Sequence, residues 1–554
     1  MYVANVGLGR PSGAVAKRRR GVQESEEMPS SPAFRSAAPI VRLTNGFVEP
    51  FDNAVATART CYSPRIVKAE DVRKDERARE VRDRIARETY QAGHHTTLQH
   101  ATFQFSLENV SRQLIWSVLH AHPFYNSEQV SQRYVEVKHD RVIVPALPER
   151  EEALYRGVVE SQMAAYGRIG ALLLPRAEAE FYRLFPGRRR TPEKWASTLK
   201  KRCQEVARYV LPIGTFAHLY HTISGLTLHR YHRLAAAYDV PTEAREVIAA
   251  MVREVEALDP LFFRELEDPL PLESTHEARA LREAGRSLGV GGADARAHRA
   301  EFDAGLQGRT STLVDWSARG EAAIAQAVRN VLGLPHSALD DSAALERVLS
   351  PRQNPYLSEA LQLGTHGKLM RTLVHASYTF QKKLSHAADS QDQRHRMTPA
   401  SRPVLQAIFV PGEPDVVVPA LLAEVPEALD VFTRTCAEAW VAIERLVSAG
   451  VAPELALYLL PNAFSIRFLE SGELLHFHHK WVHRLCYTAQ EEIWRASVEE
   501  VRQVQAVHPR IAAHLVPPCT LRKEAGVTPF CPEGPRYCGV PVWNRSLEEY
   551  ERLL

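Results

Sequence analysis

Long hydrophobic segments are missing from this sequence. No apolar run approaches the length of about 20 residues that a membrane-spanning helix needs, and the amino terminus has no apolar core of the kind found in signal peptides. Cysteine is also scarce, with 7 residues among 554, which excludes a fold held together by disulfides. These absences predict a cytoplasmic protein with reduced thiols.

An excess of one charge is missing too. Lys and Arg total 69 and Asp and Glu total 66, so the formal net charge is only +3. Proteins defined by binding to nucleic acid or to a membrane surface carry a strong imbalance or a basic stripe, and we expect neither partner. Hydrophobic residues make up 45% of the chain, which is enough for a sizeable core.

Two segments poor in large apolar residues divide the chain. Residues 1–39 are rich in Gly, Ser, Pro and charge, and they predict a disordered tail despite the basic run Lys17–Arg20. Residues 273–309 predict a linker with one short helix. The bodies between these breaks, 40–272 and 310–518, are expected to be domains, and a cysteine-containing tail follows at 519–554.

The two bodies repeat each other. The segment 41–59 has a counterpart at 311–329, and each predicts a short strand followed by a helix. HATFQF at 100–105 recurs as HASYTF at 375–380, an alternating pattern typical of a strand. Leu211-Pro212 recurs as Leu460-Pro461, each before an expected helix. These matches keep the same order and similar spacing, which indicates an internal duplication into tandem domains.

Arginines and amides cluster in the second body. They are Gln391, Arg394, His395, Arg396, Ser401, Arg402, Arg467 and Arg484. Arginine forks grip phosphate with two hydrogen bonds, and amides read the edge of a base. The last arginine lies on an expected helix with the apolar stripe Leu474, Phe477, Trp481 and Leu485. Together they favour a phosphorylated, planar ligand, although an Arg-His-Arg tripeptide alone also fits a solvated face.

The segment HASYTFQKKLSHAADSQDQRHR at 375–396 resembles the flavin-dependent thymidylate synthases, the ThyX family. In that family RHR follows a His by about nineteen positions, and His375 and Arg394 are nineteen apart. The block LPNAFSIRFLESGELLHFHHKWVHRLCYTAQEEI is similar to the family's LP…RF…NAR…LR…AQWEI. The resemblance implies flavin contacts for Arg394, His395 and Arg396, nucleotide contacts for Gln391, Ser401 and Arg402, and catalytic, nucleotide-binding roles for Arg467 and Arg484.

The first body resembles the same family in other motifs. GHHTTLQH at 93–100 is similar to GHxTPFEH and places Thr96 at a flavin-contacting position. QVSQRY at 129–134 is similar to the nucleotide loop QLSQRY. The resemblance implies substrate contacts for Arg112, Gln129, Ser131, Gln132 and Arg133. RHR is absent, with Leu119-His120-Ala121 in its place, and His218 and Ala235 replace the two later arginines.

The two copies depart from the family pattern in nearly complementary ways. In the second, four residues rather than seven separate RHR from Ser401, and Glu473-Leu474-Leu475 replaces the NAR segment that faces the flavin. Family members are homotetramers whose sites borrow side chains from neighbouring subunits. The resemblance therefore implies an α+β fold of two tandem domains, each a mixed sheet packed with long helices, and one composite site between them.

The activity implied by the resemblance is FAD-dependent methylation of deoxyuridylate to thymidylate, or of a related pyrimidine nucleotide. Methylenetetrahydrofolate and NADPH would be co-substrates, and a homodimer of tandem chains would reproduce the family's four-domain assembly. The alternative is a non-catalytic nucleotide-binding or scaffold descendant, because Glu473 and Leu475 look like scattered losses of function.

The tail carries a separate pattern outside the family motifs. Cys519, Cys531 and Cys538 fall within twenty residues, among prolines and glycines. Zinc takes four thiolate or imidazole ligands, and we take Cys486 as the fourth ligand of a zinc hypothesis, with His479 and His483 as other choices. Because no paired CxxC knuckle is present, buried or redox-silent thiols remain the alternative.

Overall fold

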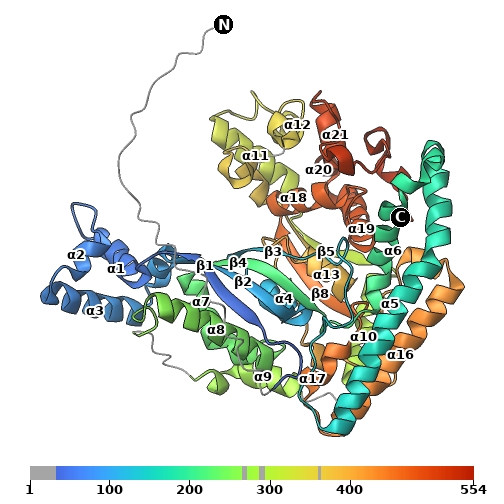
Figure 1. The fold of residues 1–554 in the computed structure, drawn as a ribbon. Coiled ribbons are helices and arrows are strands. Elements are labelled where there is room, and N and C mark those ends of the chain that lie inside the picture. The colour runs from blue at the N-terminus through green and yellow to red at the C-terminus, as the bar shows by residue number, and fades with distance from the viewer. Residues whose placement is uncertain (1–32, 265–270, 286–292, 360–362, 554) are drawn as a thin grey trace.

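A computed structural model describes residues 33–264, 271–285, 293–359 and 363–553. The predicted α+β fold of two tandem domains is confirmed, because the chain forms two units that are each built around a four-stranded sheet (Figure 1). The strand order is β1-β2-β4-β3 in the first unit and β5-β6-β8-β7 in the second. Neighbouring strands pair antiparallel in both sheets, so the expectation of a mixed sheet in each domain was wrong. The identical order supports an internal duplication.

The strands follow one another in the same order in both units, with helices at corresponding places between them. The first unit contains β1 Ile40–Gly46, α1 Pro50–Thr60, α2 Ala69–Arg73, α3 Glu76–Gln91, β2 Thr102–Ser111, α4 Arg112–His120, β3 Tyr125–Gln129, α5 Glu149–Leu184, α6 Ala196–Ala207, β4 Phe216–Ser224, α7 Gly225–Leu234 and α8 Pro241–Leu258. The second contains β5 Ser311–Trp316, α11 Gly320–Leu332, α12 Asp341–Leu349, β6 Ser377–Ser385, α13 His386–Asp392, β7 Ala400–Ser401, α14 Leu405–Ile408, α15 Ala420–Ala423, α16 Pro426–Ser448, α17 Pro453–Ala456, β8 Ser465–Glu473, α18 Leu474–Arg484, α19 Glu491–Val507 and α20 Pro509–Ala512.

The local sequence explains where the strands β2 and β6 end and where the helices α4 and α13 begin. β2 and β6 alternate buried and less buried residues, as strands with one face on the core do. Each strand ends at a serine that caps the following helix: the Ser111 hydroxyl accepts from the Leu114 amide, and the Ser385 hydroxyl from the Ala388 amide. α13 therefore starts at a fixed point and delivers Arg394 at the end of two short turns.

A bulge in β2 shifts the alignment of the two units by one residue. The RHR motif therefore corresponds to other residues of the first unit than expected. The register of β2 against β4 shifts between Leu107 and Val110, where Asn109 adopts a φ of 55°. β2 thus holds one residue more than β6, because a bulge adds a residue to one strand of a pair. Counting from the capping serines, RHR corresponds to 120–122 (His-Ala-His) and not to 119–121.

The two Leu-Pro repeats pair with each other at the boundary of the units. The Ile213 amide donates to the Leu460 carbonyl over 2.8 Å, and the Asn462 amide donates to the Leu211 carbonyl over 2.8 Å. Such reciprocal bonds are typical of a two-fold related interface between like subunits. The expectation of a helix after each Leu-Pro was wrong, since the strands β4 and β8 follow.

Buried side chains continue this reciprocity. Glu243 accepts from the Ser111 amide of its own unit and from the Tyr458 hydroxyl of the other, over 2.7 Å each. Glu492 accepts in the same way from Ser385 and from Tyr209. The long helices α5 and α16 pack side by side behind this boundary (Figure 1), and one hydrophobic core runs through both units. The tandem chain is thus a covalently joined pseudo-dimer.

The segments outside the two units are more structured than expected. Phe34, within the expected tail 1–39, is buried and bridges Pro145; the rest of that tail up to residue 32 lies outside the described residues. The linker holds two described helices, α9 His276–Gly285 and α10 Ala293–Leu306, rather than one. Residues 518–553, which begin with α21 Pro518–Glu524, bury Val540, Val542 and Tyr550 in the core of the second unit.

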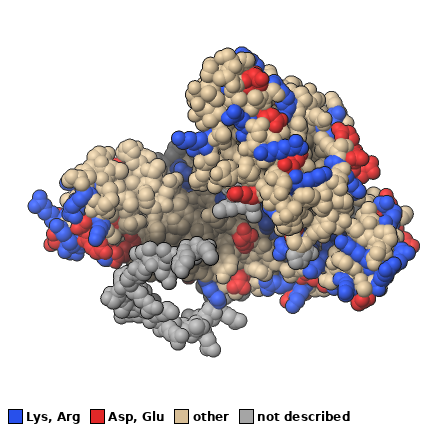
Figure 2. All heavy atoms as spheres, turned by 90° about the horizontal axis from the view of Figure 1, so that it is seen from above, with Lys and Arg blue, Asp and Glu red and all other residues tan. Residues whose placement is uncertain are grey.

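No described helix combines the length and apolarity that crossing a bilayer requires. The surface view in Figure 2 shows Lys and Arg interspersed with Asp and Glu over most of the visible face. This mixture agrees with the small formal net charge.

Candidate functional site

The RHR loop, residues 394–396, lies between α13 and β7 at the boundary of the units. Arg396 reaches across it: the guanidinium donates to the Pro123 carbonyl over 3.2 Å and to the Asn126 amide oxygen over 3.4 Å. Its carbon Cζ lies 5.0 Å from the centre of the Tyr125 ring, within range of a cation–π contact. The first unit therefore anchors the loop of the second.

His395 is held by the predicted catalytic arginine. Arg484 donates from Nε to His395 Nε2 over 3.0 Å and from Nη2 to the Gln391 carbonyl over 3.0 Å. Burial, followed by the charges of Arg484 and Lys480, lowers the pKa of His395 well below its ordinary value. Because Nε2 accepts from a cation, the neutral ring carries its proton on Nδ1.

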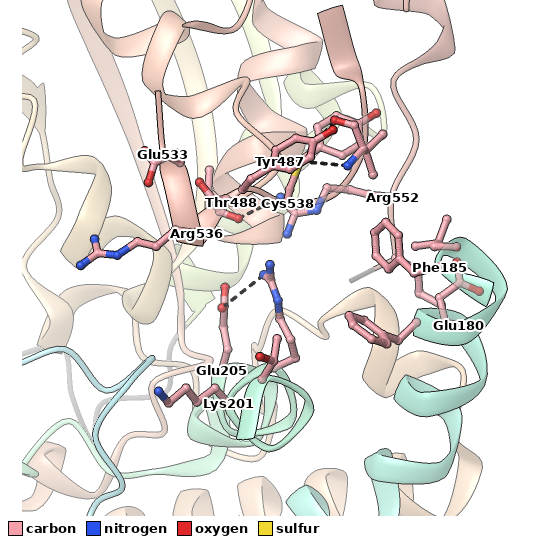
Figure 3. Close-up of a pocket in the computed structure, with 18 of the residues that line it drawn as sticks. Glu180, Phe185, Lys201, Glu205, Tyr487, Thr488, Glu533, Arg536, Cys538 and Arg552 are labelled. Carbon is pink, nitrogen blue, oxygen red and sulfur yellow. Dashed lines mark hydrogen bonds and ion pairs between the residues drawn. The ribbon is translucent and has the colours of Figure 1, made fainter. Parts of the chain in front are cut away.

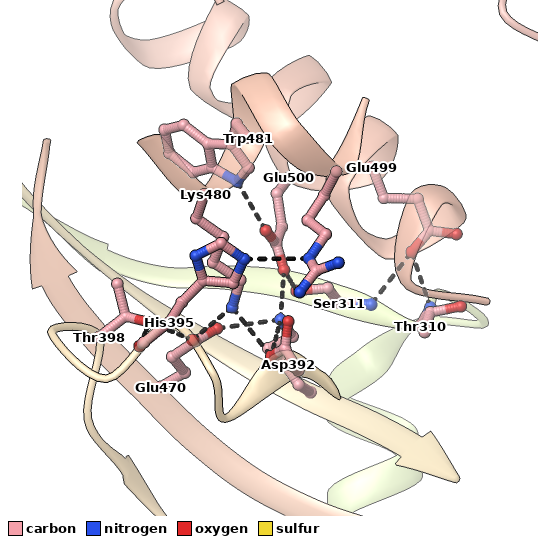
Figure 4. A network of polar contacts seen from close by, with 12 residues as sticks. Thr310, Ser311, Asp392, His395, Thr398, Glu470, Lys480, Trp481, Glu499 and Glu500 are labelled. Atoms are coloured by element: carbon pink, nitrogen blue, oxygen red, sulfur yellow. Dashed lines mark hydrogen bonds and ion pairs between the residues drawn. The ribbon is translucent and has the colours of Figure 1, made fainter. Parts of the chain in front are cut away.

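An ionic network lies beneath the loop, in the interior of the second unit (Figure 4). Lys382 Nζ lies 3.0 Å from Asp392, 2.9 Å from Glu470 and 2.9 Å from Glu500, and Lys480 pairs with Asp392 and Glu470. All five side chains are at most 1% exposed. Burial alone would raise the pKa of Asp392, but the two ammonium groups lower it well below its usual range.

Sequence reasoning missed this network, because its members are spread over five elements and each looks like an ordinary charged residue. The only local sign is a Lys in the strand HASYTFQKKLS where strict alternation expects an apolar side chain. The network ends at Asp392, two residues before Arg394, and at Lys480, one turn before Arg484. It therefore fixes both sides of the RHR loop.

Two cavities border the RHR loop, and both units line each of them. The larger, of about 1310 Å³, is lined by Arg133 of the first unit and by His395 and Arg484 of the second (Figure 3 shows part of its wall). The smaller, of about 350 Å³, is lined by Gln129 of the first unit and by Arg394 and Arg396. The geometry thus brings part of each predicted set together.

The QVSQRY loop, residues 129–134, docks onto the second unit. Arg133 donates to the Thr488 carbonyl over 2.8 Å and pairs with Glu205 over 3.0 Å. The buried Gln132 accepts from the Asn462 amide over 3.2 Å. Ser131 accepts from the Arg133 amide over 3.3 Å and so shapes the turn rather than lining a cavity.

Several buried donors near the loop have no hydrogen-bond partner within the described part of the chain: Arg112 Nε, Gln132 Nε2 and Gln391 Nε2. Arg112 is 6% exposed, and burial, together with the charges of Arg208 and Arg394, lowers its pKa to about 9. Buried polar groups are normally satisfied, so these donors suit an anionic or amide-rich ligand at this boundary.

Other predicted residues do not line the two cavities. Arg467 is held by Asp303 of α10 over 2.7 Å and by Asp415 over 2.5 Å. Arg402 forms a two-point ion pair with Asp389, with both distances 2.7 Å. Ser401 is exposed in β7, and Thr96 is exposed in the short 3-10 helix His95–His100. These four side chains are absent from both cavity walls as described.

The four cysteines of the zinc hypothesis do converge. Cys486, Cys519, Cys531 and Cys538 line one small cavity. However, the described residues contain no group of three or more His, Cys, Asp or Glu side chains placed to hold a metal ion, so the structure does not support the zinc hypothesis. Burial raises the pKa of Cys519 to about 12 and also raises the pKa of Cys538. Cys519 lies in the second core, and Cys531 and Cys538 pack against that core, as buried thiols do.

The family model described as "Thymidylate synthase complementing protein" matches residues 42–261 and 312–510, and the chain belongs to this family. Curated relatives named flavin-dependent thymidylate synthase are similar to parts of it. The one from Geobacter sulfurreducens is 31% identical over 227 residues, covering 40% of this chain and 89% of the relative. Those from Clostridium tetani and Mycobacterium sp. (strain JLS) are 26% and 28% identical, covering 40% and 33% of this chain and 85% and 68% of the relatives. Each alignment is about as long as one unit.

Proposed function

We propose that this chain methylates deoxyuridylate, or a related pyrimidine nucleotide, with a flavin at one composite site between its two units. The observation that carries the proposal is that Arg133 of the first unit lines the same cavity as His395 and Arg484 of the second. Neither unit supplies this set alone, because the first has Ala235 where the second has Arg484, and the second lacks a QVSQRY loop.

FAD suits the large cavity in size and chemistry. Typical ligand pockets measure about 300–1,000 Å³, and this cavity of about 1310 Å³ has room for a cofactor beside a nucleotide. Arg133 and Arg484 would bind phosphate groups, and the rings of Tyr134 and Tyr487 in its wall would pack against a planar ring system. A bound flavin would supply the hydride, methylenetetrahydrofolate the carbon and NADPH the reducing power.

The side chains of this chain would bind and orient the nucleotide. Hydrogen bonds to His395 and to the Gln391 carbonyl fix the Arg484 guanidinium in one position. Ligand binding would therefore not have to order a flexible side chain. Arg133 is fixed by Glu205 and Thr488 in the same way. Both cations would stabilise negative charge on the phosphate or on the pyrimidine carbonyl.

The setting of the reaction is also part of the proposal. We place it in the cytoplasm, which suits seven cysteines that are all free thiols. We further propose a homodimer of tandem chains, which would bring four units of the family together.

A second candidate is a nucleotide-binding descendant without catalysis. One observation favours it: Leu474 and Leu475, which replace part of the flavin-facing segment of the family, are 0% and 5% exposed in the core. A segment packed into the core does not face a flavin. The two candidates differ in whether the purified protein holds flavin at all.

An absorption spectrum of the full chain, taken in the flavin range before and after adding FAD and deoxyuridylate, tests the proposal. We expect flavin bands that shift when deoxyuridylate is added, and a weaker shift in Arg484→Ala. Arg495→Ala is the matched control, because Arg495 pairs with Glu491 at the surface of α19. A colourless protein that still binds deoxyuridylate would establish the second candidate instead.

A further inference from the structure

The large cavity continues away from the RHR loop to a wall that the family match covers only in part. α6 contributes Lys201, Arg202 and Glu205 to this wall, and the C-terminal segment contributes Arg536 and Arg552 (Figure 3). The family match ends at residue 510, so α6 lies inside the match and the C-terminal part of the wall lies outside it. Residues 519–553 therefore complete a cavity as well as a core.

This cavity concentrates positive charge. Ten Lys or Arg side chains line it, against five glutamates, although the whole chain has a formal net charge of only +3. A cleft lined mainly by one sign of charge focuses the potential inside it and raises the local concentration of oppositely charged ligands. The imbalance favours an anionic ligand.

Glu205 is a carboxylate in this wall that faces several arginines. Its carboxylate lies 3.0 Å from Arg133 and 3.9 Å from Arg202. Burial raises the pKa of Glu205, but the charges of Arg133, Arg202, Arg208 and Arg552 together hold it below its ordinary value. Burial and the charge of Arg202 lower the pKa of Arg552 to about 10. One carboxylate is thus shared among several guanidinium groups.

Two cations in the wall of the cavity have no partner among the described residues. Lys201 and Arg536 are exposed in the cavity wall, and neither side chain has a hydrogen bond or ion pair with another described residue. The neighbouring Lys200 differs, because it pairs with Glu136 over 2.9 Å and does not line the cavity. Cations of α6 and of the C-terminal segment therefore line the same cavity as Arg133.

We infer that this wall binds a small ligand with several anionic groups, either phosphates or carboxylates. Several anionic groups match the excess of cations in the cavity, whereas a single anion would leave most of these cations without a partner. Arginine and lysine bind both phosphate and carboxylate, so the cations alone do not separate these two sources. The inference goes beyond the proposed function, because it concerns a wall outside the family motifs.

Isothermal titration calorimetry of the full chain, without flavin or nucleotide, tests the inference. The probes are inorganic tripolyphosphate and a triglutamate peptide, and we expect at least one to bind. The double variant Lys201→Ala/Arg536→Ala should weaken that binding about tenfold or more, as expected for lost charged contacts. A phosphate-chain ligand is indicated if only tripolyphosphate binds, and a carboxylate chain if only the peptide binds.

The matched control removes two charges elsewhere, in Lys200→Ala/Arg495→Ala. This variant should change the affinity less than twofold, because both residues pair at the surface away from the wall. Equal weakening in both double variants would mean general electrostatic attraction and would overturn the inference, as would no binding of either probe. Failure of the flavin spectrum would leave this result unaffected, since no flavin is present.

Discussion

The two units share one backbone plan but fill the same interior positions with opposite chemistry. The second unit buries Lys382, Asp392, Glu470, Lys480 and Glu500 as an ionic network. Counting from equivalent caps and strand pairs, the first unit has at those positions Leu107, Val118, His221, Tyr231 and Met251, and all five line one small apolar pocket. The sheet order is unaffected by the exchange.

This difference shows what the ionic network is for. Replacing a buried ion pair by well-packed apolar residues is often neutral for stability, and the first unit folds without one. The network occurs in the unit that retains RHR, and Asp392 and Lys480 flank Arg394 and Arg484. We therefore interpret it as support for the site loop rather than as a requirement of the fold.

Breaking the network in one place should have the largest effect. Lys480→Met leaves Asp392 and Glu470 with only Lys382, and an uncompensated buried charge costs about 3–5 kcal/mol. Urea unfolding should show a loss of this size. The equivalent Tyr231→Phe should cost only about 1 kcal/mol, because it removes hydrogen bonds to His122 and His221 without exposing a charge. Equal losses would refute the contrast between the interiors.

The two later arginines should separate binding from stability. Arg484→Ala should weaken deoxyuridylate binding by about 1.5–3 kcal/mol, as for charged hydrogen bonds, because Arg484 lines the composite cavity. Arg467→Ala should leave the affinity unchanged and lower the stability, since Asp303 and Asp415 lose their shared partner. Calorimetric titration and urea unfolding measure the two effects. A loss of affinity in Arg467→Ala would place that arginine back in the nucleotide site.

The reciprocal tyrosines test how symmetric the boundary is. Tyr458→Phe removes one hydrogen bond to Glu243, and Tyr209→Phe removes one to Glu492 together with the contact from Gln490. We expect losses of about 1 to 2 kcal/mol, with the larger loss for Tyr209→Phe because it has the extra partner. The urea midpoints of both variants check which loss is larger. Equal losses would mean that the contact from Gln490 adds nothing to the boundary.

The smallest effect concerns pH. Burial is the main cause that raises the pKa of Glu243 from 4.5 to about 7. Between these two pKa values the folded state therefore holds more protons than the unfolded state. The free energy of unfolding falls as the pH rises through this range. The change should be about 1 kcal/mol between pH 6 and pH 7. Glu243→Gln cannot ionise, so urea unfolding of this variant should show a flatter dependence; an unchanged slope would assign it to another group.

The sequence predicted correctly the features that depend on neighbouring residues, and it failed for features that depend on contacts between distant segments. Strand alternation and the apolar stripe of α18 depend on neighbours along the chain, and Leu474, Phe477, Trp481 and Leu485 are all buried as predicted. The expectation of a helix after Leu460-Pro461 was wrong because β8, which follows, pairs with β6, a segment far away in the chain. The shifted RHR counterpart has a similar cause, since a bulge depends on the partner strand.

The sequence by itself determined the duplication, the family and the candidate residues, because motif spacing and periodicity are local properties. Only the tertiary structure decided which candidates meet. It brought Arg133 to His395 and Arg484 across the boundary, and it committed Arg467 and Arg402 to carboxylates instead. A guanidinium binds whichever anion the fold places beside it, and that choice rests on residues far away in the chain.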